Sequence, residues 1–124
     1  MKVLYLEDDP NDTHLVDLYV SASKHQLISV QTVEQAWRAL DQAPQLILVD
    51  VILGATRSGV DFARLLRGRG NKTPMVAVTA LATAADVHEY RSAGFDDVLT
   101  KPFTIMQLAQ TIERQLPMWG DLAG

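Results

Sequence analysis

The stretch Gln45-Leu46-Ile47-Leu48-Val49-Asp50 decides how the rest of this chain is interpreted. Its apolar residues follow one another without alternation, which is typical of a strand buried on both faces in the middle of a parallel sheet. The run ends on a carboxylate, at the edge where open α/β sheets bind ligands. Taken alone, Asp50 is most simply a turn-capping residue. It becomes a functional candidate if other strands bring partners to the same edge.

Four further short segments, at residues 3–6, 27–30, 75–78 and 97–100, predict strands, and each of the five strands is followed by a stretch with helical spacing. Strict alternation of strand and helix predicts a parallel sheet with helices on both faces. Five units are too few for a closed eight-stranded barrel. The predicted fold class is therefore α/β, with an open, doubly wound, five-stranded sheet.

Local signals place the helix starts. Asp9 followed by Pro10 predicts the first helix, with an apolar stripe over residues 15, 18, 19 and 22. Ser58 with an acid three residues later predicts the third helix. Thr104 with Gln107 predicts the last one, which carries apolar residues at 105, 108, 112 and 116 and is ended by Pro117.

Composition limits the possible functions. We expect the 124 residues to form a single domain with its core over about residues 2–116 and a short tail, 117–124. The net charge of −4 argues against nucleic-acid or anionic-membrane binding. The chain has no cysteine, no signal-peptide pattern and no apolar run of membrane-spanning length, so a cytoplasmic location is expected.

Polar residues follow four of the five predicted strands. They are Glu7 and Asp8 after the first, Asp50 after the third, Thr79 after the fourth and Lys101 after the fifth. Each alone has a simple structural explanation, such as helix capping or β-propensity. Four strands that deliver polar groups to one edge predict a site.

The residue types indicate phosphoryl transfer. Carboxylates in contact repel each other by about 4 kcal/mol per pair at an effective dielectric of 20, so they require a proton or a cation. Lys101 offsets one charge, and Mg²⁺ (or Mn²⁺) suits the remaining hard oxygen ligands. An ionised Asp50 beside a metal is a plausible nucleophile toward phosphorus. The metal, Lys101 and the Thr79 hydroxyl would then stabilise the three phosphoryl oxygens.

At this point the sequence closely resembles the receiver domain of two-component response regulators, of the single-domain chemotaxis kind. The resemblance covers essentially the whole chain and rests on five motifs in order: Leu6-Glu7-Asp8-Asp9-Pro10, Ile47-Leu48-Val49-Asp50, Ser58-Gly59, Val78-Thr79-Ala80 and Lys101-Pro102-Phe103. It implies a flavodoxin-like fold with strand order 2-1-3-4-5. It also implies phosphorylation by a sensor histidine kinase or a histidine phosphotransfer protein, which would control the binding of a downstream protein target.

The resemblance also implies a role for each site residue. Asp50 would be the phosphoacceptor, Asp8 a direct metal ligand, and Glu7 the holder of a metal-bound water. The backbone carbonyl of Ile52 would complete the metal coordination, and the bond before Pro102 would be cis. The residues expected to contact the phosphoryl group, or to move with it, are Thr79, Ala80 and Lys101.

Two positions depart from the family pattern. Gly54 stands where the family often has proline, which should loosen a loop that is one residue longer than the commonest form. Val98 stands where the family often has the aromatic residue of its switch. We therefore expect any switch to use Thr79 and the backbone over residues 80–85.

Several alternatives remain open. The chain could be a receiver domain cut from a longer response regulator or hybrid kinase, although Met1 just before the first strand favours a native start. An aspartyl-phosphate phosphatase would need an acid–base aspartate where Ile52 stands. A flavodoxin would need a phosphate loop where Glu7 and Asp8 would repel the ligand. A monomer or weak homodimer is expected. The apolar Ile52 and Leu81 predict slow self-dephosphorylation.

Overall fold

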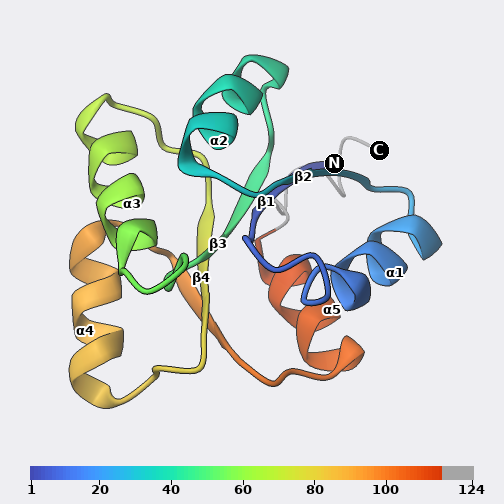
Figure 1. The fold of residues 1–124 in the computed structure, drawn as a ribbon. Coiled ribbons are helices and arrows are strands. Elements are labelled where there is room, and N and C mark those ends of the chain that lie inside the picture. Colours follow the sequence, from blue (N-terminus) through green and yellow to red (C-terminus); the bar gives the residue numbers. More distant parts are fainter. Residues whose placement is uncertain (116–124) are drawn as a thin grey trace.

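The computed structural model describes residues 1–115, in which five strands alternate with helices (Figure 1). The strands are β1 (Lys2–Leu6), β2 (Gln26–Val30), β3 (Leu46–Asp50), β4 (Met75–Thr79) and β5 (Asp97–Thr100). The helices are α1 (His14–Ala22), α2 (Val33–Ala39), the short 3-10 helix η1 (Leu40–Gln42), α3 (Ser58–Gly68), α4 (Ala84–Ala93) and α5 (Ile105–Arg114). The predicted helix end at Leu116 and Pro117 and the tail 117–124 lie outside the described residues.

All the strands form one parallel sheet in the order β2-β1-β3-β4-β5, which confirms the predicted fold class and strand order. β3 lies in the centre, and its residues from Leu46 to Asp50 are all buried. β2 lies at one edge and is only partly buried. The unbroken apolar run that precedes Asp50 is therefore the middle strand of the sheet.

Helices cover both faces of the sheet. α1 and α5 lie on one face, and α2, α3 and α4 lie on the other (Figure 1). Each face has its own apolar core. Val16, Val20, Leu108 and Ile112 belong to the core under α1 and α5, whereas Ala36, Phe62, Leu66 and Tyr90 belong to the core under α2, α3 and α4.

The predicted start of the first helix is wrong by several residues. α1 begins at His14 and not at Pro10, because residues 10–13 form a turn in which Asp9 Oδ1 accepts a hydrogen bond from the Asn11 amide at 2.9 Å. The predicted apolar stripe is also wrong: the buried residues are Val16 and Val20, whereas Leu18 is 48% exposed. Aspartate before proline fits a turn as well as a helix cap.

The other helix starts agree better with the sequence. Thr104 forms a capping box with Gln107, as its pattern predicts, and Thr83 forms one with Asp86 at the start of α4. The third helix, α3, begins at Ser58 as predicted, with Arg57 in the cap position. Ile105 is 46% exposed although the periodicity predicted it to be apolar surface facing the core. None of the helices in residues 1–115 combines the length and the apolar composition that crossing a membrane requires.

Candidate phosphoacceptor site

The strand ends bring the predicted site residues to one edge of the sheet. Glu7 follows β1, Asp50 ends β3, Thr79 ends β4 and Lys101 follows β5. Glu7, Asp50 and Thr79 are each at most 5% exposed. Burial to this degree is unusual for the carboxylates of Glu7 and Asp50 unless they have a charged partner. The arrangement therefore requires a cation at the same edge.

Lys101 supplies that charge. Its Nζ lies 3.0 Å from Glu7 Oε2, 3.0 Å from Asp12 Oδ2 and 3.1 Å from Asp50 Oδ2. Burial by itself would lower the pKa of Lys101, but the hydrogen bonds to these three carboxylates outweigh it and raise that pKa above its ordinary value. Lys101 is therefore positively charged, and its ion pairs connect the end of β5 to the ends of β1 and β3.

Glu7 is the most deeply buried acid of the site. Its Oε1 accepts a hydrogen bond from the Asp9 amide at 3.2 Å, and its Oε2 accepts one from the Tyr5 hydroxyl at 3.3 Å. Burial raises the pKa of Glu7 to about 8, and the neighbouring Asp50 adds to the rise while Lys101 opposes it. At neutral pH, Glu7 therefore keeps its proton unless a further cation enters the site.

Three carboxylates fit such a cation. Glu7, Asp8 and Asp50 each offer an oxygen, and these oxygens lie within 4.8 Å of one another. Asp8 is exposed, whereas the other two are buried, so the set opens toward solvent on the Asp8 side. An all-oxygen donor set of this kind, with room for water, fits Mg²⁺.

The loop after β3 holds Asp8 in place. The Gly54 amide donates a hydrogen bond to Asp8 Oδ2 at 2.7 Å, with Gly54 at φ +64°. Reciprocal backbone hydrogen bonds between Leu53 and Thr56, at 3.0 and 3.2 Å, close the loop into a tight turn. The prediction of a loosened loop considered only the missing proline, whereas these hydrogen bonds hold the loop in place. Glycine removes the rigid φ of proline but adds an amide donor that proline lacks.

Asp50 is held by the backbone around it. Its Oδ1 accepts a hydrogen bond from the Ile52 amide at 3.0 Å, which leaves Oδ2 toward Lys101. Gly59, in the first turn of α3, packs directly on this strand end: a Cβ there would lie 2.3 Å from the Asp50 carbonyl oxygen. The Ser58-Gly59 motif therefore reflects a close approach of two backbones.

Thr79 and its neighbours lie on the other side of Asp50. Thr79 Oγ1 accepts a hydrogen bond from the Leu81 amide at 3.0 Å, and Ala80 is exposed. The Lys101–Pro102 peptide bond is cis, as the resemblance implies. Val98 pairs with Ala77 in the sheet and packs against the core under α2, α3 and α4.

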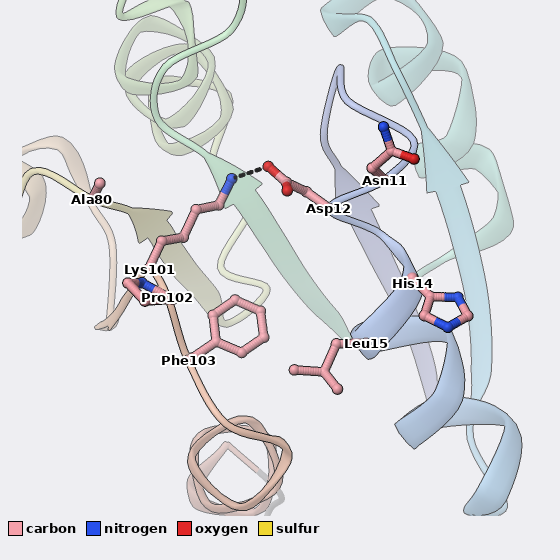
Figure 2. A pocket seen from close by; sticks show the side chains of 8 residues that line it. All are labelled: Asn11, Asp12, His14, Leu15, Ala80, Lys101, Pro102 and Phe103. Carbon is pink, nitrogen blue, oxygen red and sulfur yellow. Dashed lines mark hydrogen bonds and ion pairs between the residues drawn. The ribbon is translucent and has the colours of Figure 1, made fainter.

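A pocket of about 400 Å³ lies beside the lysine (Figure 2). Figure 2 shows Asp12 and Lys101 joined at its upper rim and Leu15 and Phe103 facing one another below them. Its lining residues come from the turn before α1, the start of α1 and the segments after β4 and β5: Asn11, Asp12, His14, Leu15, Ala80, Lys101, Pro102 and Phe103.

Two residues of the site were missed in the sequence. Asp12 contacts Lys101, but the predicted helix start at Pro10 placed it inside a helix and away from the edge. Tyr5 donates its hydroxyl to Glu7 from within the buried strand β1. A hydroxyl in an otherwise aliphatic strand was the available signal, because a buried hydroxyl requires a partner.

Comparison with known proteins gives the family. The model of the response regulator receiver domain matches residues 3–113. The chain is 30% identical over 125 residues to response regulator RppA of Synechocystis, covering 96% of this chain and 53% of that protein. It is 31% identical over 111 residues to transcriptional regulatory protein CpxR of Escherichia coli K12, covering 90% and 47% respectively. The chain thus spans about half the length of these curated relatives.

Solved structures agree in fold. Chemotaxis response regulator CheY4 of Vibrio cholerae superposes with a TM-score of 0.83 at 22% identity, covering 93% of this chain and 98% of that one. The receiver domain of a histidine kinase from Syntrophus aciditrophicus gives a TM-score of 0.79 at 28% identity, covering 93% and 89%. With the family match over most of its length, this chain belongs to the response regulator receiver domain family.

Proposed function

We propose that this chain is a phosphoacceptor in two-component signalling, in which Asp50 takes a phosphoryl group from a phosphohistidine of a sensor kinase or phosphotransfer protein. An Asp50 carboxylate oxygen attacks phosphorus, the bond between phosphorus and the histidine nitrogen breaks, and the imidazole leaves with the bonding pair. The observation that carries the proposal is the contact of one ammonium, that of Lys101, with Asp50, Glu7 and Asp12 at the carboxyl edge of the sheet.

Each side chain at the edge has a task in this reaction. Lys101 already lies 3.1 Å from Asp50 Oδ2, so it is placed to stabilise charge on a phosphoryl oxygen bound there. Thr79 would give its hydroxyl to a second oxygen after it releases the Leu81 amide. The Ile52 amide would hold Asp50 Oδ1 and so orient the carboxylate for attack.

Glu7, Asp8 and Asp50 would hold Mg²⁺ (or Mn²⁺), with the Ile52 carbonyl as a further ligand. Bound there, the ion would neutralise the carboxylates and the incoming phosphoryl oxygens. Since the raised pKa of Glu7 reflects burial beside Asp50, a cation in this site should replace its proton. The donor set and its charge thus support the proposed cofactor.

The output would be a change in partner binding. A phosphoryl group controls a partner only if it stabilises one of two conformations more than the other. Histidine kinases and an unidentified downstream protein are the proposed partners, and a receiver within a longer regulator is the alternative, since the relatives are about twice as long. Family membership favours the receiver function over a phosphatase or a flavodoxin.

The phosphorylated form should be long-lived. Ile52 and Leu81 flank the site with apolar side chains and offer no group to position an attacking water. An acyl-phosphate half-life of only seconds at neutral pH would contradict this proposal. Replacement of Leu81, which is 45% exposed, by Glu should shorten the half-life.

Intact mass spectrometry after incubation with Mg²⁺ and acetyl phosphate tests the function. We expect one added phosphoryl group on the wild-type chain, none on Asp50→Asn, and none when a chelator removes the metal. Asp17→Asn, which changes an acid on α1 away from the sheet edge, is the matched control and should be modified like the wild type. An unmodified wild-type chain with every donor tried would overturn the proposal.

A further inference from the structure

A buried tyrosine lies behind the loop that follows Thr79. Tyr90, on α4, is 0% exposed, and its hydroxyl donates a hydrogen bond to the Leu81 carbonyl at 2.7 Å. Its ring packs edge-on against Phe95 at 6.3 Å between centroids. Because the ring is fixed in the core, the hydroxyl holds one backbone position of the loop against α4.

Leu81 is also hydrogen-bonded to the site, through its backbone amide. The Leu81 amide donates to Thr79 Oγ1 at 3.0 Å, while the Leu81 carbonyl accepts from Tyr90. A movement of the Thr79 hydroxyl therefore breaks a bond to Leu81 and changes what Tyr90 holds. Two hydrogen bonds, from the Leu81 amide to Thr79 and from the Tyr90 hydroxyl to the Leu81 carbonyl, thus connect the end of β4 to α4.

A third segment joins this chain of contacts. Arg57, at the end of the loop after β3, donates from Nη2 to the Tyr90 hydroxyl at 3.2 Å, and its guanidinium lies 5.7 Å from the centre of the ring. The same nitrogen lies 3.5 Å from Asp86 and 3.5 Å from Glu89 on α4. Ion pairs this exposed contribute little alone. They nevertheless keep the guanidinium over the tyrosine.

From these contacts we infer that Tyr90 transmits the position of the loop after β4 to α4, in place of the aromatic residue that is missing at Val98. We call Leu81, Tyr90 and Arg57 the tyrosine link. Tyr90 is a positioning residue: it touches no reacting atom and acts through Leu81 on Thr79. The inference rests on the proposed function, since a phosphoryl group on Asp50 is what would draw Thr79 away.

The link predicts how the signal reaches α4. The capping box of α4 joins Thr83 to Asp86, and the Val87 amide donates to the Thr83 carbonyl at 2.9 Å in its first turn. When Thr79 releases the Leu81 amide, the Leu81 carbonyl shifts relative to the fixed Tyr90 ring. The first turn of α4, to which Arg57 is also tied through Asp86, then loosens.

Amide hydrogen exchange on the unmodified protein tests the holding role. Tyr90→Phe removes one hydroxyl and keeps the ring, so the Leu81 amide should exchange roughly 3- to 10-fold faster, as for the loss of one hydrogen bond. Arg57→Gln should have a smaller effect, because the bond from Tyr90 to Leu81 remains. Tyr19→Phe is the matched control, since the Tyr19 hydroxyl has no hydrogen bond to another described residue, and it should leave Leu81 unchanged. Unchanged exchange in Tyr90→Phe would overturn the inference.

Exchange after modification with acetyl phosphate and Mg²⁺ tests the transmitting role. In the wild type, the adduct should speed exchange of the Val87 amide; in Tyr90→Phe, the same adduct should leave Val87 as in the unmodified variant. Equal responses in both proteins would overturn the inference and leave the proposed function intact. If the wild type forms no adduct, the proposed function fails and the transmitting role fails with it. A structural role for Tyr90 alone would alter exchange throughout the core, with or without the adduct.

Discussion

The acidic edge and the tyrosine link both adjoin the strand ends but are built differently. The acidic edge, which comprises Glu7, Asp8, Asp12, Asp50 and Lys101, is a dense set of charges. The tyrosine link is a chain of hydrogen bonds through one neutral hydroxyl, which joins the loops after β3 and β4 to α4. The first region is suited to bind charge, and the second is suited to report movement.

This difference has an energetic reason. Charges packed at low exposure interact strongly, so removing one changes the free energy of all the others. A hydrogen bond between neutral groups contributes about 1 kcal/mol and can be exchanged for another at little cost. A switch requires two states close in free energy, which favours bonds of the second kind. Substitutions in the acidic edge should therefore change mainly the stability of the protein. Substitutions in the tyrosine link should change mainly its dynamics.

Replacement of Lys101 by Met should have the largest effect. It removes the cation from three carboxylates, and we expect the metal-free protein to lose about 3 kcal/mol of unfolding free energy at neutral pH. Mg²⁺ should bind the variant more tightly and restore much of the loss, because it no longer meets a neighbouring cation. Urea unfolding with and without Mg²⁺ measures both effects.

Lys72→Met is the control for that experiment, because Lys72 is exposed and makes no ion pair among the described residues. It should change the unfolding free energy by less than about 0.5 kcal/mol. Equal stability of the Lys101 and Lys72 variants would mean that the acidic edge is not organised by Lys101.

Gly59→Ala should follow in size. Its Cβ would lie 2.3 Å from the Asp50 carbonyl oxygen and 2.8 Å from the Val51 Cα, so the start of α3 must move away from β3. We expect a loss of about 2 kcal/mol, measured by urea unfolding. Gly68→Ala, in the same helix, meets nothing within 4 Å and should instead stabilise by about 0.5–1 kcal/mol. If both variants are stabilised, the close approach at Gly59 is wrong.

The fold could be predicted from the sequence wherever buried apolar residues form a continuous run or a regular pattern. Continuous apolar runs located the strands, and their alternation with helices gave the fold class. The errors lie where one local pattern has two outcomes. Asp9-Pro10 is compatible with a helix cap and with a turn, and the contacts of α1 with the sheet decide for a start at His14. Those contacts bury Val16 and Val20, which the predicted stripe left out.

The acidic edge was predictable, and the tyrosine link was not. Asp50 ends a strand and Glu7 and Lys101 directly follow strands, so topology alone brings them together. The partners of Tyr90 lie 33 and 9 positions away on two loops, and no periodicity relates them. The loss of an aromatic residue at Val98 was visible in the sequence, but the helix that offers another one could be found only from the packing.

The pH dependence should separate the two regions further. Between pH 4.5 and about 8, folded metal-free protein keeps a proton on Glu7 that the unfolded chain has released. The unfolding free energy should therefore fall as the pH rises through this range. Mg²⁺ needs the ionised carboxylates, so its affinity should rise with pH over the same interval.

Urea unfolding across this pH range, compared with Glu7→Gln, isolates the contribution of Glu7. The variant cannot ionise at residue 7 and should lose that part of the pH dependence. Tyr90→Phe should keep it, since the Tyr90 hydroxyl bonds to Leu81 and Arg57 and not to Glu7. A wild-type stability that rises with pH relative to Glu7→Gln would contradict the raised pKa.

Gly54→Ala should have the smallest effect and tests whether the two regions are independent. Gly54 has φ +64° and nothing within 4 Å of a Cβ, so the cost is backbone strain of about 1 kcal/mol, and Gly54→Asn should cost less.

Gly54 holds Asp8, while Arg57, at the end of the same loop, holds Tyr90. The hydrogen bonds between Leu53 and Thr56 close the turn between them, so strain at Gly54 should leave Leu81 amide exchange unchanged. Faster exchange at Leu81 would instead mean that the loop after β3 couples the metal ligand to the tyrosine link directly.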